Sequence, residues 1–509
     1  MSVEVPGESV RGVASVSAPA PPADGITVEQ MRALHEAQLQ SFLHDGPPDA
    51  DTRLDRLDRL ATAVSQNAED LAAAMSADFG NRPAAGAFGL EVLLQLEEIR
   101  MARRQLRKWM RPRRPQPRYM RALGIDAWVE PTPLGVVGVI APWNFPLGLA
   151  VQPAASAIAA GNRVMIKPSE LTPRTAEAIG TALSGYFPAE EITVITGGPE
   201  VGAAFSALPF DHLFFTGSAA VAKHVQRATA DNLTPLTFEL GGKNPTVVAS
   251  DATLPHAASR IIKARMINSG QICLSPDYVF VPTSQHEQFV KALLDTASAK
   301  LPSFGEHPDV CTIINNDHYR RVMGLVDDAR RRGATVHQLL SPGDIAPAPA
   351  TRRIPLTVIT GVTPDMAVMN EEIFGPILPI LTYTDVQEVI DFVNARPCPL
   401  GAYWFGPDSA DFRTFVKHTR TGGVTRNDFA LHAAVPGLPF GGVGQSGSGY
   451  YHGRFGFDTF SHLRAVAVSP RSYSAISALS PPFRPGLTGG LRLANRLWGA
   501  SVARRLRRT

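Results

Sequence analysis

A cysteine in the segment NSGQICLSP is of a residue type that can act as a nucleophile. Cys273 follows Gly270, which permits the close approach of a ligand or of another backbone segment. Nucleophilic attack requires a partly exposed thiol with a lowered pKa. A cysteine between Ile272 and Leu274 is more often a packed core residue, so this segment alone favours a structural role. The other two cysteines have no neighbours that indicate chemistry.

A glutamate and an asparagine could support such a nucleophile. Glu239 in TFELGGKNP lies between two large apolar residues, where desolvation would raise its pKa towards that of a base near neutrality. An ion pair with Lys243 is an equally good interpretation of this glutamate. Asn144 in PWNFP could donate its amide to an oxyanion, an effect of ~3–4 kcal/mol. The alternative for Asn144 is a turn residue that caps the next helix.

Three short segments could hold a phosphate or a ribose. In FTGSAAVAK, Gly217 and Ser218 stand at the start of a predicted helix, whose free N–H groups and dipole attract phosphate. In VMIKPSE, Lys167 could reach a ribose or phosphate and Glu170 could accept from ribose hydroxyls, although most such lysines are merely solvated. The first strand is not followed by G-x-G-x-x-G, so the ordinary dinucleotide fingerprint is absent.

The elements that must position these residues follow an alternating pattern. From residue 135 onward, short apolar strands alternate with helices, and a second α/β series runs from PTVVAS to about residue 421. Near-continuously apolar strands of this kind predict parallel sheets covered by helices on both faces. Helices are expected before them, at 27–43 and 51–75. A chain of 509 residues is too long for one core and should form two or three domains.

The segment 131–162 contains no Asp, Glu, Lys or Arg and is long enough to cross a membrane. However, Pro146 and Pro153 interrupt helical hydrogen bonding, and the β-branched residues at 136–140 favour a strand. We therefore expect a buried strand, a tight loop and a buried helix instead of a membrane span.

Composition and charge narrow the class of protein. Three cysteines cannot form a disulfide framework or a zinc site, and no secretory signal is visible, which indicates a reducing, cytoplasmic location. Residues 459–509 contain nine Arg and no acidic residue, whereas residues 1–458 carry 40 basic and 46 acidic groups, a net charge of −6. A mildly acidic body does not favour a nucleic-acid partner. The tail LRLANRLWGASVARRLRRT could form a basic amphipathic helix on an anionic membrane surface, or a solvated or docked tail.

The order of PWNFP, KPSE, FTGS, ELGGK, GQIC and EEIFGP closely resembles the aldehyde dehydrogenase superfamily over roughly residues 30–465. The segments RPCPLGAYWFG, TRNDFALH and LPFGGVGQSGSGYYHGRFGFDTFSH resemble its class 3 branch, particularly the coniferyl-aldehyde-dehydrogenase-like members. One departure is visible, since Ala222 stands where the family has the second glycine of its pyrophosphate turn. We expect it to alter the helix approach to the cofactor slightly, without loss of activity.

The resemblance implies a role for each matching residue. It makes Cys273 the nucleophile, Glu239 the general base and Asn144 the side-chain half of the oxyanion hole, with no metal. The residues that it assigns to the cofactor are Trp143, Lys167, Glu170, Gly217, Ser218, Val221, Glu372 and Phe374. The residues that it assigns to an aldehyde tunnel, for each of which core packing is the alternative, are Phe145, Leu149, Ile272, Leu274 and Phe440.

The resemblance also implies an α/β aldehyde dehydrogenase fold with a Rossmann-like cofactor domain, an α/β catalytic domain and a small β oligomerisation arm, in a homodimer. The expected segments are a disordered tail at 1–25, the cofactor domain at 26–111 and 134–240, the arm at 112–133 and 424–440, the catalytic domain at 241–423, a returning segment at 441–470 and the basic tail at 471–509.

The implied reaction is the NAD(P)-dependent oxidation of a hydrophobic or aromatic aldehyde to its acid through a cysteine thiohemiacetal and thioester. Glu170 disfavours a 2′-phosphate through like charge, which favours NAD over NADP. The alternatives are a catalytically silent binding protein on the same fold and an enzyme that passes the acyl group to coenzyme A. The presence of Glu239 argues against the second, because acylating relatives tend to lack this base.

Overall fold

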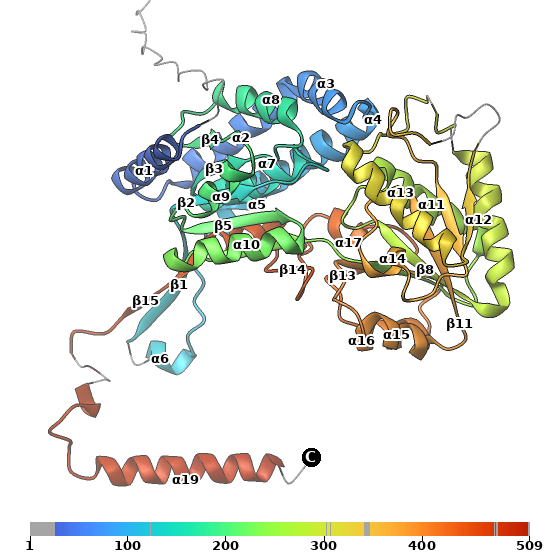
Figure 1. Cartoon of the computed structure of the whole chain (residues 1–509). Coiled ribbons are helices and arrows are strands. Elements are labelled where there is room, and N and C mark those ends of the chain that lie inside the picture. The colour runs from blue at the N-terminus through green and yellow to red at the C-terminus, as the bar shows by residue number, and fades with distance from the viewer. Residues whose placement is uncertain are drawn as a thin grey trace, which may run out of the picture. The chain divides into compact units, whose positions relative to one another are not determined.

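The computed structural model describes residues 26–122, 124–301, 303–305, 307–340, 347–472, 474 and 477–506 (Figure 1). The predicted disordered tail at 1–25 lies outside these residues. The contacts between residues divide the chain into two compact units. The first comprises Met1–Met110 and Thr132–His462, and the second comprises Arg111–Pro131 and Leu463–Thr509.

The first unit contains a six-stranded sheet with the order β14-β6-β5-β2-β3-β4. Its strands are β2 (Val136–Ile140), β3 (Arg163–Lys167), β4 (Ile192–Val194), β5 (His212–Gly217), β6 (Leu236–Leu240) and β14 (Gly447–Ser448). All pairs are parallel except that of β14 with β6. The chain builds outward from β2 through β3 to β4, then returns to place β5 and β6 on the other side of β2. This reversal is the topological switch point at which doubly wound sheets bind ligands, at the carboxyl ends of their strands.

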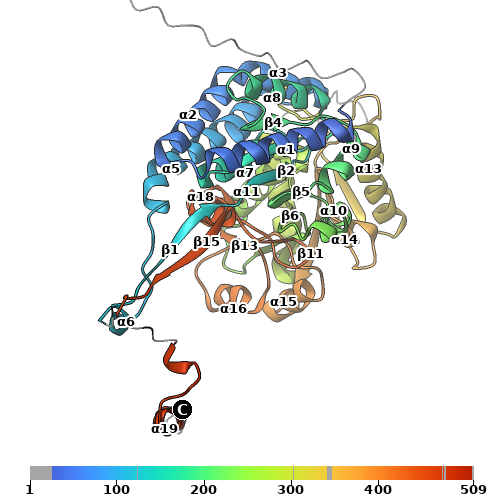
Figure 2. The same ribbon diagram turned by 90° about the vertical axis from the view of Figure 1, so that its left-hand side faces the viewer.

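Both faces of this sheet are buried by helices, which explains the apolar strands. Val137 and Val139 of β2 pack in the same cluster as α7 (Gly148–Ala160), whereas Val136 packs in the cluster that holds residues of α1 (Val28–Asp45) and α10 (Ala219–Thr229). Successive side chains of a strand point to opposite faces, so a strand covered on both sides must be apolar at every position. In Figure 1, α10 runs alongside β5, and in Figure 2, α1 crosses in front of the strands.

The uncharged segment 131–162 thus contains the end of β1 (Asp126–Pro133), then β2, a loop and α7, and the predicted strand, loop and buried helix are confirmed. Within the residues described, no helix has the length and apolar character that crossing a membrane requires.

One predicted helix is wrong in its extent. The apolar periodicity predicts a single helix at 51–75, but the structure has α2 (Ala50–Gln66) and α3 (Ala68–Phe79), separated at Asn67. The Asn67 side chain donates to the carbonyl of Ala63 at 2.8 Å, and its backbone leaves the helical region. Asparagine competes for backbone hydrogen bonds in this way, which the apolar periodicity of the segment does not reveal.

A second sheet in the same unit has seven strands in the order β13-β12-β7-β8-β11-β10-β9. They are β7 (Asn244–Val248), β8 (Pro276–Pro282), β9 (Thr335–Gln338), β10 (Thr357–Thr360), β11 (Ile377–Tyr383), β12 (Gly401–Phe405) and β13 (Gly423–Arg426). Every pair is parallel except that of β9 with β10. The α/β series predicted up to about residue 421 is therefore present as this second sheet.

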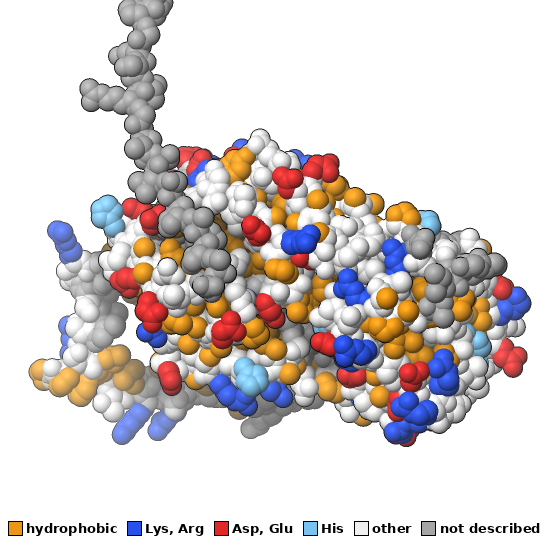
Figure 3. Space-filling view, turned by 45° about the horizontal axis from the view of Figure 1, so that its top comes forward, with side chains coloured by type: hydrophobic (Ala, Val, Ile, Leu, Met, Phe, Trp, Pro, Cys, Tyr) orange, Lys and Arg blue, Asp and Glu red, His pale blue; other side chains and the backbone are white. Residues whose placement is uncertain are grey.

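The other helices of the first unit connect or cover the two sheets. They are α4 (Ala84–Gly86), the π-helix η1 (Ala87–Leu93), α5 (Leu94–Trp109), α8 (Pro173–Ser184), α9 (Pro199–Ser206), η2 (Ala230–Asn232), α11 (Leu254–Met266), η3 (Ile267–Gly270), η4 (Thr283–Gln285), α12 (His286–Lys300), α13 (Asn316–Arg331), α14 (Ala367–Asn370), α15 (Val386–Asn394), α16 (Ala410–His418), α17 (Leu431–Ala434) and α18 (Gly453–Thr459). The face shown in Figure 3 carries acidic and basic side chains interspersed.

The second unit contains a two-stranded sheet and the C-terminal helix. Strand β1 (Asp126–Pro133) pairs with β15 (Ser461–Val468), and the unit also holds α6 (Arg118–Ala122), η5 (Ser477–Leu479) and α19 (Leu487–Leu506). The family resemblance implies that 112–133 and 424–440 form one arm. In the structure, 424–440 begins inside β13, which pairs with β12 of the seven-stranded sheet.

Candidate active site

Three ionisable residues from separate elements meet in the first unit. Cys273 lies in the half-buried loop between η3 and β8, Glu239 near the carboxyl end of β6, and Glu372 in the loop after α14. Burial, followed by the charges of Glu372 and Glu239, raises the pKa of the Cys273 thiol to about 12, which is opposite in direction to the lowered pKa expected of a nucleophilic thiol. The charge of Glu239 therefore acts on the Cys273 thiol, although Glu239 lies in the six-stranded sheet and Cys273 in the loop that leads into β8 of the seven-stranded sheet.

Glu239 carries a carboxyl group that is buried inside the protein. Its residue is 3% exposed, and neither carboxyl oxygen has a hydrogen-bond partner in the part of the chain that the structure describes. Burial holds its pKa well above the usual value of 4.5. The alternative ion pair with Lys243 is wrong, because the Lys243 ammonium lies 2.5 Å from a carboxylate oxygen of Asp277. A buried, unpaired carboxyl with a raised pKa is what a general base near neutrality requires.

Asn144 is buried beside the nucleophile loop. Its side-chain amide donates to the carbonyl oxygen of Gln271 at 3.2 Å, two residues before Cys273. The helix-capping alternative is wrong, because the first N–H groups of α7, those of Leu147 and Gly148, donate to a carboxylate oxygen of Glu91 at 2.9 and 3.1 Å. The Asn144 side-chain amide is thus hydrogen-bonded to the loop that carries the Cys273 thiol.

The nucleophile loop has an unusual backbone. Asn268 and Ser269 adopt left-handed conformations with φ of 49° and 51°, and Gly270 follows with φ of 76°. A Cβ on Gly270 would lie 2.3 Å from the carbonyl oxygen of Gly375, so only glycine fits there. The loop is then fixed by Asn244, whose amide donates to the carbonyl oxygen of Cys273 at 2.7 Å. Strain of this kind is stored where the surrounding structure holds a functional group in place.

Two of the predicted cofactor residues, Trp143 and Phe374, contact one another, with ring centroids 5.4 Å apart. Phe374 has φ of 51°, a conformation that non-glycine residues rarely adopt. Burial and the nearby Asp277 raise the pKa of Glu372 to about 8, and one of its buried oxygens has no hydrogen-bond partner among the residues described. An unpartnered acceptor of this kind fits a ribose hydroxyl, which donates a hydrogen bond.

The other cofactor candidates surround the carboxyl ends of β3 and β5. Lys167 ends β3 and is only 2% exposed, so the simply solvated alternative is wrong; its ammonium donates to the Pro168 carbonyl at 2.8 Å and lies 3.9 Å from Glu170. Ser218 caps α10 by accepting from the N–H of Val221 at 3.3 Å. Gly217 packs so closely that a Cβ would lie 2.6 Å from the Phe215 ring.

These positions agree with the chemistry of a dinucleotide. The loop of Trp143 and Asn144 follows β2, Lys167 ends β3, and Gly217 ends β5, so all three lie at the carboxyl edge of the sheet beside its switch point. The start of α10 offers N–H groups for a pyrophosphate. Val221 is 49% exposed on the first turn of α10, and Ala222 is buried against the sheet. The residues present therefore fit a nicotinamide dinucleotide.

Most of the predicted tunnel residues belong to one apolar cluster that also includes Cys273. Ile272, Leu274 and Phe440 are buried members of this cluster, and Phe145 packs against it. Leu149 is half-buried on α7 and is not part of the cluster. Because core packing would give the same burial, the tunnel stays a prediction.

Several residues of this site carry no signal in the sequence. The side-chain amides of Asn244, Asn268 and Gln271 donate to backbone carbonyls of the two loops. Arg82 and Glu91 reach the Asn144 loop from more than fifty positions away. Each is an ordinary polar residue in its own segment. Only the arrangement of the elements places them at the site.

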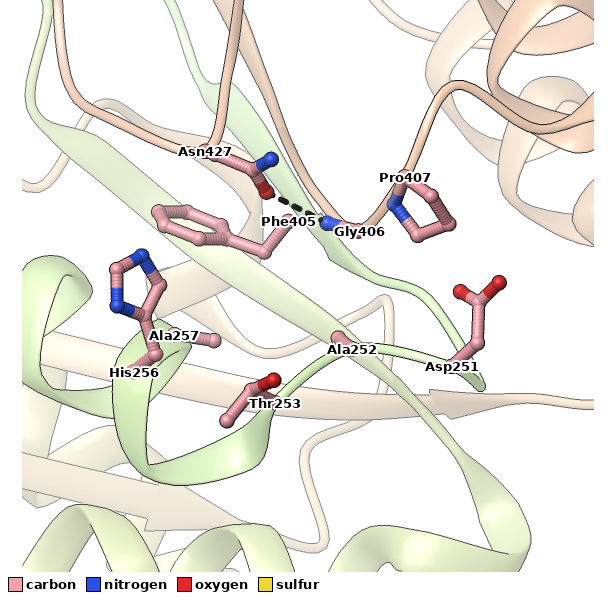
Figure 4. Close-up of a pocket in the computed structure, with 9 residues that line it drawn as sticks. All are labelled: Asp251, Ala252, Thr253, His256, Ala257, Phe405, Gly406, Pro407 and Asn427. Carbon is pink, nitrogen blue, oxygen red and sulfur yellow. Dashed lines mark hydrogen bonds between the residues drawn. The ribbon is translucent and has the colours of Figure 1, made fainter.

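A separate pocket of about 370 Å³ lies at the carboxyl ends of the strands of the seven-stranded sheet (Figure 4). Its walls come from the segments that follow the carboxyl ends of β7, β12 and β13, where the Asn427 side chain accepts from the Gly406 N–H at 2.8 Å. Cys273 precedes the amino end of β8 in the same parallel sheet. The pocket is therefore across the sheet from the thiol.

Comparison with known proteins identifies the family. Residues 27–466 match the model of the aldehyde dehydrogenase family. The chain belongs to this family. It is 43% identical over 460 residues to a probable coniferyl aldehyde dehydrogenase of Caulobacter vibrioides, covering 90% of this chain and 95% of the relative. It is also 42% identical to a coniferyl aldehyde dehydrogenase of a Pseudomonas species, strain HR199, covering 91% and 96%.

Related structures agree with this identification. The substrate-bound state of Staphylococcus aureus AldH superimposes with a TM-score of 0.83 at 34% identity, covering 92% of this chain and 99% of that one. PnpE in complex with nicotinamide adenine dinucleotide gives a TM-score of 0.79 at 26% identity, covering 88% and 91%. The predicted aldehyde dehydrogenase fold is confirmed, and the enzyme uses a nicotinamide cofactor to oxidise an aldehyde.

Proposed function

We propose that this aldehyde dehydrogenase oxidises hydrophobic or aromatic aldehydes to carboxylic acids, with Cys273 as nucleophile, Glu239 as general base and Asn144 as oxyanion donor. The observation that carries the proposal is the buried carboxyl group of Glu239, which has no hydrogen-bond partner among the residues described and whose pKa burial holds well above its usual value. The relatives named for coniferyl aldehyde oxidation and the apolar residues clustered with Cys273 support the substrate class.

In the proposed reaction, the Cys273 thiol releases its proton to water and the thiolate sulfur bonds to the aldehyde carbon. The C=O π bond breaks, and the Asn144 amide and the Cys273 N–H donate to the new oxyanion. A bound oxidised nicotinamide supplies the acceptor for the hydride, which leaves a thioester on Cys273. Glu239 then takes a proton from water, and the hydroxide attacks the thioester carbon. The carbon–sulfur bond breaks and the acid and the thiol are released.

The assignment predicts different defects for two variants. Cys273→Ala should form no NADH at all. Glu239→Gln should still give a pre-steady-state burst of NADH and then stall, because hydride transfer precedes hydrolysis. Stopped-flow absorbance at high enzyme concentration measures both, and equal loss of the burst in the two variants would refute the assigned roles.

Hydrolysis distinguishes this reaction from acyl transfer to coenzyme A. With Glu239 in place, we expect steady-state NADH formation without added coenzyme A, at a rate that coenzyme A does not raise. A strict requirement for coenzyme A would favour the acylating alternative. The absence of NADH with any aldehyde would favour a catalytically silent binding protein.

We further propose a preference for NAD over NADP. Glu170 lies 3.9 Å from the buried Lys167 ammonium at the carboxyl end of β3, where its negative charge would repel a 2′-phosphate. Initial rates with the two cofactors should favour NAD, and Glu170→Gln should reduce that preference. Equal rates in the wild-type enzyme would contradict this proposal.

For the second unit, we propose two contacts outside the active site. Residues 112–133, which include β1, are proposed together with 424–440 of the first unit to pair subunits in a homodimer, which sedimentation of the full chain tests. Helix α19 carries the exposed side chains of Leu491, Leu497 and Trp498 together with arginines and no acidic residue. We propose that it binds an anionic membrane surface peripherally. Full-length protein should pellet with phosphatidylglycerol vesicles more than a version ending at Ser480, and equal pelleting would contradict the proposal.

A further inference from the structure

A buried ion pair lies outside the residues that the family resemblance assigns. The guanidinium of Arg82 lies 2.5 Å from a carboxylate oxygen of Glu91, and the two side chains are 3% and 0% exposed. Taking two charges out of water costs several kcal/mol per ion, so such a pair gives little net stability. The role of the Arg82–Glu91 pair must therefore be inferred from the other groups that the two side chains contact.

Both side chains bind the loop that carries Asn144. Arg82 donates to the carbonyl oxygen of Asn144 at 2.9 Å, and its guanidinium lies over the Phe145 ring, 5.0 Å from the centroid. Glu91 uses its second oxygen to accept from the N–H groups of Leu147 and Gly148. The pair thus holds the loop on both sides of Phe145, through its backbone.

The same loop is joined to the nucleophile loop through two shared carbonyl oxygens, those of Asn144 and Gln271. The carbonyl oxygen of Asn144 accepts from Arg82 and also from the side-chain amide of Asn268, at 3.1 Å. Asn268 and the Asn144 side chain both donate to the carbonyl of Gln271. A movement of the Asn144 backbone would therefore shift its amide relative to Cys273.

Local structure explains how Glu91 reaches this position. It lies in η1, a seven-residue π-helix between α4 and α5. A π-turn inserts a residue and rotates the helix face, and such turns occur frequently at functional sites. Here Glu91 points inward while Leu93 and Leu94 remain exposed, a cost that an ordinary amphipathic helix would avoid.

We propose that Arg82 and Glu91 are positioning residues, which hold the Asn144 amide where the oxyanion forms during attack by Cys273. The proposal rests on the oxyanion role given to Asn144 above. Neither side chain contacts the Cys273 sulfur or the aldehyde carbon in the proposed reaction. It acts through the Asn144 backbone and through the first turn of α7.

A double-mutant cycle on the rate of the NADH burst tests this role. Asn144→Ala should slow the burst by about a hundredfold to a thousandfold. Arg82→Met should slow it about tenfold or more in the wild-type background, and by less than about twofold when Asn144 is already alanine, because residues that act as a unit are not additive. The dissociation constant of NAD should change by less than about twofold in Arg82→Met.

A matched control separates positioning from general stability. Arg53 is also 3% exposed and donates to the carbonyls of Ala159 and Ala160, at the far end of α7. Arg53→Met should lower the thermal midpoint as Arg82→Met does, without slowing the burst. Glu91→Gln, which keeps the shape of the acceptor, should slow the burst and serves if Arg82→Met does not fold.

Three results would overturn the proposal in different ways. If Arg82→Met slows the burst by the same factor with and without the Asn144 amide, only the positioning role fails. If Arg53→Met slows the burst as much as Arg82→Met, the effect is one of stability and the positioning role again fails. If Asn144→Ala keeps a normal burst, the oxyanion assignment fails and the positioning role fails with it.

Discussion

Replacing Gly241 by alanine should weaken cofactor binding by displacing Glu372. A Cβ on Gly241 would lie 2.1 Å from one carboxylate oxygen of Glu372 and 2.6 Å from its carboxyl carbon. The Glu372 backbone cannot move away easily, because Arg321 donates to the carbonyls of Glu372 and Ile373 at 3.2 and 2.7 Å. The carboxylate itself must therefore shift by more than about 1 Å to reach an ordinary contact distance.

A shift of this size breaks a hydrogen bond. If Glu372 accepts from the nicotinamide ribose, the loss of one charge-assisted bond is worth about 1.5–3 kcal/mol, or about tenfold to a hundredfold in the dissociation constant of NAD. Titration calorimetry measures that constant, and Glu372→Gln should weaken binding in the same direction. Gly324→Ala is the control, because a Cβ on Gly324 in α13 meets nothing within 4 Å. Unchanged NAD binding in Gly241→Ala would refute the ribose role of Glu372, and weak binding in Gly241→Ala with normal binding in Glu372→Gln would assign the effect to Gly241 alone.

Three further outcomes follow from burial. Since burial and Glu372 raise the pKa of Cys273 to about 12, the rate of its alkylation by iodoacetamide in the free enzyme should keep rising about tenfold per pH unit from pH 8 to 10. Glu372→Gln should shift this rate profile to lower pH. A plateau of the rate near pH 9 would contradict the prediction. Burial lowers the pKa of His212 to about 4, so the free energy of unfolding should fall as pH decreases from about 6.5 towards 4, because only the unfolded chain binds the proton in that range. Urea unfolding at several pH values measures this dependence, and in His212→Leu the slope of unfolding free energy against pH should be smaller by up to about 1.4 kcal/mol per pH unit. An unchanged slope would exclude His212 as a cause of the pH dependence. Leu57 is 0% exposed, so Leu57→Ala should cost about 2–5 kcal/mol of unfolding free energy in the same assay, whereas Leu43→Ala, at a side chain of a residue 63% exposed, should cost far less.

The sequence predicted the parts of this enzyme whose signal is local. Strand β2 is apolar at nearly every position because both of its faces are covered, and that condition is visible in five consecutive residues. The loop PWNFP and the motifs around Glu239 and Cys273 could be recognised in the same way, by residue type and order. Hydrophobic periodicity reports how a segment is buried, and it failed where a single hydrogen bond from Asn67 divided a helix.

Only the tertiary structure decided which of these residues meet. Glu239 lies in one sheet and Cys273 in the loop before a strand of the other. No spacing along the chain could therefore show that Glu239 has no ion-pair partner among the described residues while Lys243 pairs with Asp277. Arg82 and Asn144 are separated by 62 positions, and their contact depends on how α7 packs beside η1. Local sequence sets the burial pattern of each element, but strand order and helix packing set distances between elements, and the site is made of those distances.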